Sequence, residues 1–244
     1  MLKRKIEQQI LMWKQNKDHK PLIIKGCRHC GKTFSVLKFC EENYENVVYI
    51  NFFNNPKYAA IFKNSFEVDD IIMMISALMG KDTAFVPYKT VIIFDEIQSC
   101  PEARTALKFF CLDGRYDVIG TGSLLGVSGY AKAPVSIPVG YETVITMYPL
   151  DLEEFLWANG INERMIDLLR RHLQEKTPVA EPLHSRCHQL LLQYVVVGGM
   201  PDVVQHFIDT KQMNVVLQMQ RDIVRSYEDD MVTYSPTYRG GGLP

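Results

Sequence analysis

The stretch GCRHCGKT, residues 26–33, decides the fold of this 244-residue chain. It fits the Walker A pattern G-x-x-x-x-G-K-[ST], a glycine-rich loop that joins a buried strand to a helix. Gly26 and Gly31 allow the backbone to wrap closely around phosphate groups, because neither residue carries a Cβ atom. Backbone N–H groups of the loop and of the helix N-terminus then attract the anion. The pattern therefore predicts a phosphate-binding loop.

The residues of this loop predict where ATP and a magnesium ion bind. Lys32 is expected to reach the β- and γ-phosphates, and the Thr33 hydroxyl is expected to bind Mg²⁺. The predicted nucleotide-binding positions of the loop are Gly26, Cys27, Arg28, His29, Cys30, Gly31, Lys32, Thr33 and Phe34.

A second motif follows about sixty residues later, where the apolar run TVIIF ends in Asp95 and Glu96. A buried strand that delivers a carboxylate at its end is typical of a Walker B motif. Asp95 is expected to hold Mg²⁺ through water, and Glu96 to orient and polarise the attacking water. The alternative is a surface acid pair that caps the next helix. The adjacent acids, and the strand expected between the two motifs, favour ATPases over GTPases.

The fourth predicted strand ends in Thr121-Gly122-Ser123. A polar residue at this position can lie between the two Walker motifs and sense the γ-phosphate. Thr121 and Ser123 are both candidates, and an ordinary turn is the alternative.

Apolar patterning predicts five strands, at residues 21–25, 47–53, 91–94, 116–121 and 142–147, alternating with helices at 4–15, 32–44, 68–79 and 102–112. This order predicts an α/β fold, the three-layer αβα sandwich of P-loop NTPases with a mostly parallel sheet. Further helices are expected at 151–158, 162–176, 184–197, 201–209 and 212–231. The expected domains are an ATPase core (1–149), a helical lid (150–234) and a flexible tail (235–244) that marks a truncation point.

Composition excludes several classes of protein. Hydrophobic residues make up 47% and charged residues 23%, unlike a disordered chain, a collagen-like chain or a coiled coil. No apolar run approaches the ~20 residues that span a bilayer, and no signal peptide is recognisable. We therefore expect a cytoplasmic protein with no membrane partner. The net charge of −1 gives no bulk support for nucleic-acid binding, although residues 1–40 are basic.

Six cysteines are expected to be reduced in such a protein. Cys27 and Cys30 form a CxxC at a helix N-terminus, where thiol pKa values tend to fall. A redox switch of the loop is one reading, and two small loop fillers are the other. Zinc binding by these cysteines and His29 lacks a second pair of ligands at zinc-finger spacing.

The matching pieces GCRHCGKT, VIIFDEIQ, VIGTGSLLG, MYPLDLEEFL, YVVVGGMPDVV and RDIVRSYEDDM run from about residue 20 to residue 231. On these pieces the chain resembles bacterial and archaeal AAA-family ATPases of the STAND and archaeal-ATPase branch, in the group normally followed by a C-terminal domain of unknown function. The Walker motifs are common to many families, whereas MYPLDLEEFL and the GGMP segment are more specific.

The resemblance implies an ATPase core with a helical lid, and a Gly-x-Pro motif, Gly199 to Pro201, near the bound adenine. It also implies that a further domain would begin where this chain stops. The loop departs from the family's usual GPRRVGKT at its filler positions. An arginine finger is not identifiable, although Arg104 and Arg115 are candidates by position and surface residues are the alternative.

The sequence thus predicts a Mg²⁺-dependent ATPase that couples ATP and ADP states to lid movement. One alternative is an ATP-dependent binding switch or scaffold with little turnover. Another is the ATPase part of a DNA-processing protein. The protein partner and the oligomeric state stay open.

Overall fold

The computed structural model describes residues 2–80, 84–123 and 140–234, so the expected tail at 235–244 lies outside the described residues. Its contacts separate two compact units. One unit is Ile6–Met147, and the other combines Met1–Lys5 with Tyr148–Pro244. The sequence-based division lies two residues later, after residue 149, and keeps the first five residues in the core domain.

The Ile6–Met147 unit is built on a five-stranded sheet with the strand order β2-β3-β4-β1-β5, in which every pairing is parallel. The strands are β1 (Leu22–Gly26), β2 (Asn46–Asn51), β3 (Thr90–Asp95), β4 (Asp117–Ser123) and β5 (Thr143–Met147). Because all five run the same way, their carboxyl ends meet at one edge, which is where ligands bind in sheets of this kind.

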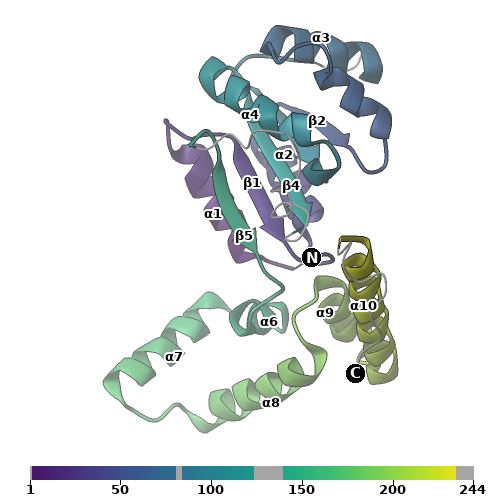
Figure 1. Ribbon diagram of the computed structural model, residues 1–244. Coiled ribbons are helices and arrows are strands. Elements are labelled where there is room, and N and C mark those ends of the chain that lie inside the picture. Colours follow the sequence, from purple (N-terminus) through teal and green to yellow (C-terminus); the bar gives the residue numbers. More distant parts are fainter. Residues whose placement is uncertain (1, 81–83, 124–139, 235–244) are drawn as a thin grey trace. The chain divides into compact units, whose positions relative to one another are not determined.

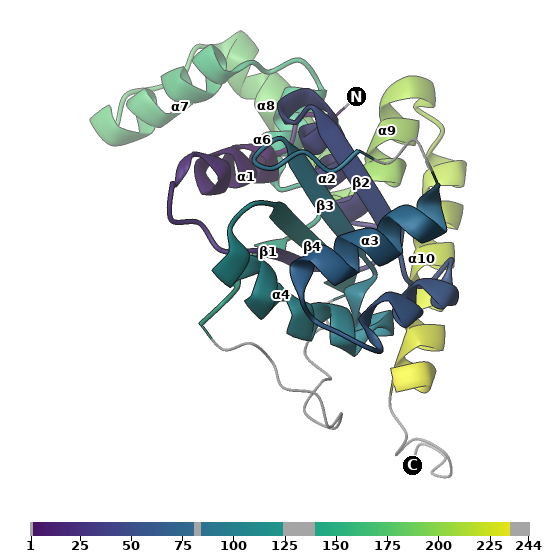
Figure 2. The same ribbon diagram turned by 90° about the horizontal axis from the view of Figure 1, so that it is seen from above.

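Helices cover both faces of this sheet (Figures 1 and 2). They are α1 (Lys5–Gln15), α2 (Lys32–Asn43), α3 (Val68–Met79) and α4 (Pro101–Asp113), with the 3₁₀ turns η1 (Pro56–Phe62) and η2 (Ile97–Ser99). Side chains of β1 alternate between two apolar clusters. Ile23 packs with α3, α4 and η1, whereas Leu22 and Ile24 pack with α1 and α2. The predicted three-layer αβα architecture is confirmed.

The second strand is shorter than the sequence predicts. It ends at Asn51 instead of residue 53, and Phe53 is 67% exposed. The side chain of Asn51 accepts a hydrogen bond from the Asn54 backbone N–H at 2.7 Å. Such a side-chain turn offers the backbone an alternative to the sheet ladder, and Pro56 then begins η1. The turn signal outweighs the apolar pattern at this point.

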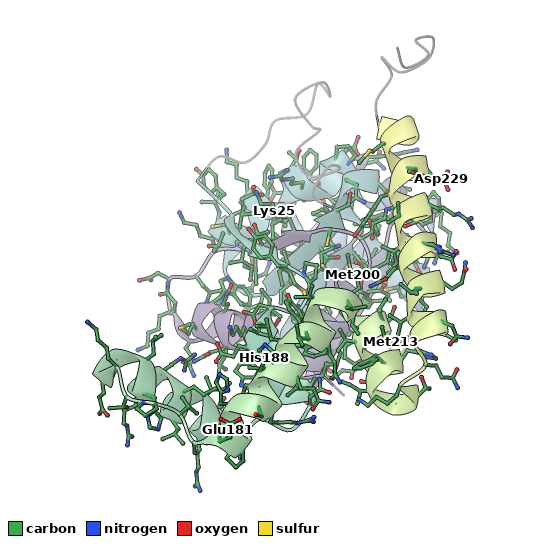
Figure 3. The ribbon with its side chains drawn as sticks, turned by 90° about the horizontal axis from the view of Figure 1, so that it is seen from below. Lys25, Glu181, His188, Met200, Met213 and Asp229 are labelled. Carbon is green, nitrogen blue, oxygen red and sulfur yellow. The ribbon has the colours of Figure 1, made fainter. Side chains whose placement is uncertain are left out.

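The second unit is helical, as predicted. Its helices are α6 (Leu152–Ala158), α7 (Glu163–Glu175), α8 (Glu181–Val197), α9 (Pro201–Thr210) and α10 (Met213–Tyr234). Figure 3 labels Glu181 and His188 on α8 and Met200 before α9. The prediction began α8 at residue 184, but Pro182 lies in its first turn, where a missing N–H is tolerated.

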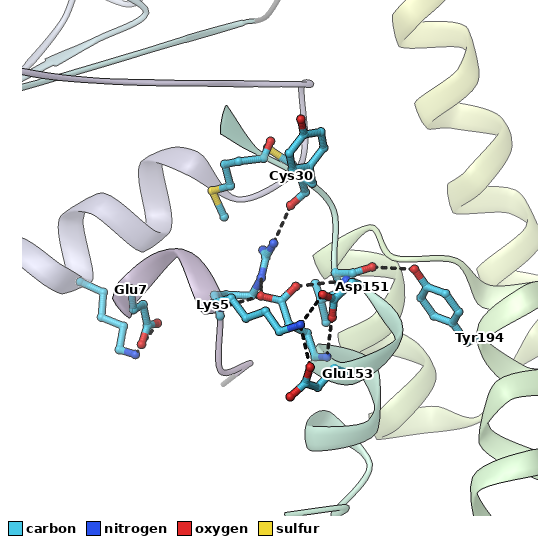
Figure 4. A network of polar contacts seen from close by, with 12 residues as sticks. Lys5, Glu7, Cys30, Asp151, Glu153 and Tyr194 are labelled. Carbon is cyan, nitrogen blue, oxygen red and sulfur yellow. Dashed lines mark hydrogen bonds and ion pairs between the residues drawn. The ribbon is translucent and has the colours of Figure 1, made fainter. Parts of the chain in front are cut away.

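The first residues of the chain are tied to α6 within this unit (Figure 4). Asp151 and Glu154 form a capping box at the start of α6. Glu154 also accepts hydrogen bonds from the Lys5 backbone N–H at 2.6 Å and from Arg4 Nε at 3.2 Å. Arg4 donates further to the Tyr148 carbonyl at 2.6 Å. The buried Glu154 carboxylate therefore accepts hydrogen bonds both from the start of α6 and from residues 4 and 5. The sequence pattern does not predict this role.

Within residues 2–80, 84–123 and 140–234, no helix is long and apolar enough to cross a membrane.

Candidate functional site

The predicted phosphate-binding loop lies between β1 and α2, at the carboxyl edge of the sheet. Gly26 is the last residue of β1 and lies beside Ser123 of β4 and Met147 of β5 in the strand register. A Cβ atom on Gly26 would lie 2.3 Å from the Met147 carbonyl oxygen, so only glycine fits there. Gly31 has a φ of 90° and caps α2. Both glycines of the motif are thus explained by backbone geometry.

Lys32 is buried at the base of the loop, with 7% of its surface exposed. Its Nζ donates to the carbonyl oxygens of Gly26 at 3.1 Å and Cys27 at 2.8 Å. A buried ammonium group held by neutral carbonyls has hydrogen bonds but no counter-charge from these two partners. An anion such as phosphate can replace those carbonyls with a gain in Coulomb energy.

Asp95 is the most highly connected carboxylate at this edge, and only 2% of it is exposed. Thr33 Oγ1 lies 3.1 Å and 3.2 Å from its two oxygens, and Thr121 donates to Oδ1. Tyr49 donates to Oδ2 at 2.6 Å and Asn51 Nδ2 at 2.8 Å. All four donors are neutral, and within the described ranges no lysine, arginine or histidine pairs with this carboxylate. An oxygen-rich site with an uncompensated negative charge fits Mg²⁺.

Sequence reasoning missed Tyr49 and Asn51. Both lie on β2, whose residue Asn51 is directly opposite Asp95 in the parallel register. Residues two apart on a strand share a face, so both side chains lie on the side of Asp95. The polar positions in the run VVYIN were the available signal, but its apolar neighbours led to a prediction of a buried strand alone.

Of the two candidate sensors, Thr121 is the residue that contacts the second motif. It is fully buried on β4 and donates to Asp95. Ser123 lies at the end of β4 beside Gly26. The alternative that the sequence left open, an ordinary turn, does not describe Thr121, which lies within the strand.

Glu96 follows β3 in the left-handed backbone conformation, with φ 52° and ψ 47°. Its carboxylate accepts a hydrogen bond from Gln98 Nε2 in the 3₁₀ turn that follows. The Oε1 atom of Gln98 is buried and finds no donor in the part of the chain that the structure describes. Leaving such an acceptor unpaired costs about 1–3 kcal/mol. The two acids therefore diverge, Asp95 toward the loop helix and Glu96 toward η2.

The remaining loop side chains divide by exposure. Phe34 is 58% exposed on α2, and His29 is exposed with a positive φ of 63°. Cys30 is buried with its Sγ 3.7 Å from the Met147 carbonyl oxygen, whereas Cys27 and Arg28 are partly exposed. All six cysteines lie in the described ranges, and none of them forms a disulfide.

Gly199 and Pro201 lie in the helical unit. The Leu150 N–H donates to the Gly199 carbonyl at 2.7 Å, and a Cβ on Gly199 would lie 2.1 Å from the Leu150 carbonyl oxygen. Tyr194 donates to that same oxygen at 2.9 Å. The two family-specific segments, MYPL and GGMP, are thus packed against each other. As predicted, α9 begins at Pro201.

Both arginine-finger candidates form ion pairs with acidic residues of their own unit. Arg104 is buried and forms a two-pronged ion pair with Glu142, at 2.6 Å and 3.1 Å. The reading of Arg104 as a surface residue is therefore wrong. Arg115 pairs with Asp113 and Asp69 at 2.7 Å each, just before the amino end of β4 and so away from the loop.

Comparisons with known proteins identify the family of this chain. A family described as "AAA domain" matches residues 18–156, more than half of the chain. The chain therefore belongs to this family of P-loop ATPases, which confirms the resemblance seen in the sequence. No curated protein matches it.

One solved structure in the comparison shares the fold. A Walker-type ATPase of Pyrococcus abyssi superposes with a TM-score of 0.55 at 13% identity, covering 98% of this chain and 77% of that one. The origin recognition complex of Drosophila bound to DNA gives a TM-score of 0.46 at 12% identity, covering 97% of this chain and 68% of that one. The family and the fold together support nucleotide binding and hydrolysis in general terms.

Proposed function

We propose that this chain binds Mg²⁺-ATP on residues 26–33 and hydrolyses it. The observation that carries the proposal is Asp95, a buried carboxylate surrounded by neutral donors beside the loop. A buried charge without a counter-charge is unfavourable unless a ligand compensates it. A divalent cation that also contacts Thr33 would do so.

Lys32 and the loop backbone bind the triphosphate in this proposal. The Lys32 ammonium leaves the carbonyls of Gly26 and Cys27 and donates to the β- and γ-phosphate oxygens. The backbone N–H groups from residue 27 to residue 33 surround the phosphates, and the start of α2 adds its positive dipole.

Thr33 and Asp95 hold the metal ion. The Thr33 hydroxyl, which donates to Asp95, and the Asp95 carboxylate would be the groups that hold the cation. When bound, Mg²⁺ supplies positive charge against the negative charge that develops on the phosphate oxygens. Thr121 stays hydrogen-bonded to Asp95 and keeps its orientation.

Glu96 polarises the attacking water. Its carboxylate accepts one proton of that water as the oxygen attacks the γ-phosphorus in line, and the ADP oxygen leaves on the opposite side. Thr121 and Ser123 lie near enough to the loop through β4 to respond to the γ-phosphate, which is the sensor role we propose for them.

In this proposal the helical unit is the part of the chain that responds to the bound nucleotide. Its Gly199-Met200-Pro201 turn contacts adenine, by resemblance to the family, and its movement is the output of hydrolysis. The family supports an ATPase core, and the segment pairing around Leu150 supports a rigid turn at this position.

The decisive experiment measures binding and turnover separately. ATP binding is followed by calorimetry with Mg²⁺ and with EDTA, and phosphate release is followed in the same preparation. Binding that is stronger with Mg²⁺, together with steady turnover, supports the proposal. Binding without turnover would instead favour the nucleotide-dependent switch, and absence of binding would refute both.

A further inference from the structure

We propose that Gln98 is a positioning residue that holds the Glu96 carboxylate ready for the attacking water. This inference rests on the proposed ATPase function. The Gln98 side chain folds back over the short turn η2, so that its Nε2 donates to Glu96 Oε2. Only Ile97 separates them in the chain, so the contact depends on the shape of the turn.

The turn itself is fixed by the backbone and by the core. Ser99 N–H donates to the Glu96 carbonyl at 2.9 Å, and Cys100 N–H donates to the Ile97 carbonyl at 3.0 Å. Ile97, between the two polar residues, is fully buried in the apolar cluster beneath α4. Gln98 therefore presents its amide from a rigid support rather than from a loose loop.

The backbone of Glu96, at the start of this turn, lies in the left-handed region. A non-glycine residue with φ 52° occupies the sparsely populated left-handed region. That conformation reverses the chain after β3 and separates the Glu96 side chain from that of Asp95. Strain of this kind persists where the surroundings impose it, and it concentrates at functional sites.

The orientation of the amide is set by charge. An ionised carboxylate can only accept hydrogen bonds, so Gln98 must present its NH₂ group to Glu96. Its carbonyl oxygen is then left buried without a donor among the described residues. A side chain that served stability alone would be better replaced by an apolar one of the same length, which leaves no acceptor unpaired. The amide of Gln98 therefore serves the orientation of Glu96 rather than stability.

The chemical consequence concerns the second oxygen of the carboxylate. With Oε2 engaged by Gln98, the rotation of the carboxylate is restricted and Oε1 remains as the acceptor for the proton of the water. General-base catalysis depends first on this geometry. Gln98 acts through Glu96 and touches neither nucleotide nor metal in the proposal.

The test replaces Gln98 by methionine, which keeps the length and removes both polar atoms. We expect Gln98→Met to lower kcat about tenfold or more while affinity for a fluorescent ATP analogue stays within about twofold. The midpoint of thermal unfolding should stay equal or rise, because the unpaired acceptor is gone. A purely structural glutamine predicts the reverse, a less stable protein with normal turnover per folded molecule. Ser99→Ala, an exposed neighbour in the same turn, is the matched control.

A double variant completes the test. In a Glu96→Gln background, Gln98→Met should cause no further loss of turnover, because the group that it positions is already removed. Parent-like kcat in Gln98→Met, or a full additional loss in the double variant, would overturn the role of Gln98 and leave the ATPase proposal intact. A parent chain that binds ATP without hydrolysing it would instead overturn the ATPase proposal, and the role of Gln98 with it.

Discussion

Two aspartates, at opposite ends of neighbouring strands, show how the same side chain can have different roles. Asp95 lies at the carboxyl end of β3 and Asp117 at the amino end of β4. Each accepts a hydrogen bond of 2.6 Å from a tyrosine hydroxyl, Tyr49 and Tyr44 respectively. Asp117 also has a partner that is cationic when protonated, His19, whose Nε2 lies at 2.8 Å. The partners of Asp95 are all neutral.

The difference lies in where the counter-charge comes from. Burial alone would raise the pKa of Asp117, but the hydrogen bonds from His19 and Tyr44 outweigh it and hold that pKa below its usual value. The charge at this end is therefore balanced within the protein whenever His19 is protonated. At Asp95 the protein supplies hydrogen bonds without a positive charge, which leaves the balance to a bound cation. We infer a structural role for Asp117 and a ligand role for Asp95.

The largest effect is expected at the loop lysine. Lys32→Ala should weaken ATP binding by about 100-fold or more, since it removes the buried cation that we assign to the phosphates. The fold should persist, with an unchanged circular dichroism spectrum. Lys14→Ala is the matched control, because Lys14 lies near Asp117 with its Nζ over the Tyr44 ring. Unchanged affinity in a calorimetric titration of Lys32→Ala would remove the phosphate-binding assignment.

The second effect separates binding from chemistry. Glu96→Gln should still bind Mg²⁺-ATP, because Asp95 and not Glu96 is on the metal side. Turnover should fall on the order of 10²-fold, because the neutral amide cannot take the proton of the water. Phosphate release and nucleotide retention on the same sample measure both quantities. Hydrolysis at the parent rate would mean that the catalytic base lies elsewhere.

A pair of asparagine substitutions tests the comparison directly. Asp95→Asn should abolish the part of the ATP affinity that depends on Mg²⁺, about tenfold, and leave the affinity in EDTA unchanged. Asp117→Asn should leave both affinities unchanged and lower the free energy of unfolding by about 1–3 kcal/mol, because His19 and Tyr44 lose a charged acceptor. If the two variants behaved alike, the distinction between ligand and structural aspartates would be wrong.

Much of the fold was predictable because the sheet is buried and its strands are separated by helices with clear periodicity. The runs at β1 and β3 are continuous and apolar, as expected for a parallel sheet covered on both faces. The site was predictable where a motif fixes local backbone, as in residues 26–33. It was not predictable where distant segments meet, because register decides that Tyr49 and Asn51 face Asp95. The pairing of Arg104 with Glu142 is hidden for the same reason.

A smaller effect is expected at the turn of the helical unit. Pro201→Asp should weaken ATP and ADP binding alike, by several-fold, because both ligands carry the adenine that we assign to this turn. Affinity for inorganic triphosphate should not change. An equal loss for triphosphate would indicate general misfolding, and unchanged ATP binding would make the turn purely structural, as its close contact with Leu150 would then suffice to explain Gly199.

The smallest effect is a pH dependence confined to the amino end of β4. The hydrogen bond to Asp117 raises the pKa of His19 above its usual value of 6.5, against the lowering effects of burial and of Lys14. A raised folded-state pKa adds stability that is complete below the unfolded value and is lost as the pH rises through the folded value. The lowered pKa of Asp117 adds stability that is present above pH 3.8 and is lost as the pH falls through the folded-state pKa.

The stability advantage of the parent over His19→Gln should therefore be larger at about pH 6 than at about pH 8.5 in urea unfolding. ATP affinity should be equal in both proteins at each pH. If the stability advantage were the same at both pH values, the charge of His19 would not contribute to stability. Asp117 would then not differ from Asp95 in the way proposed.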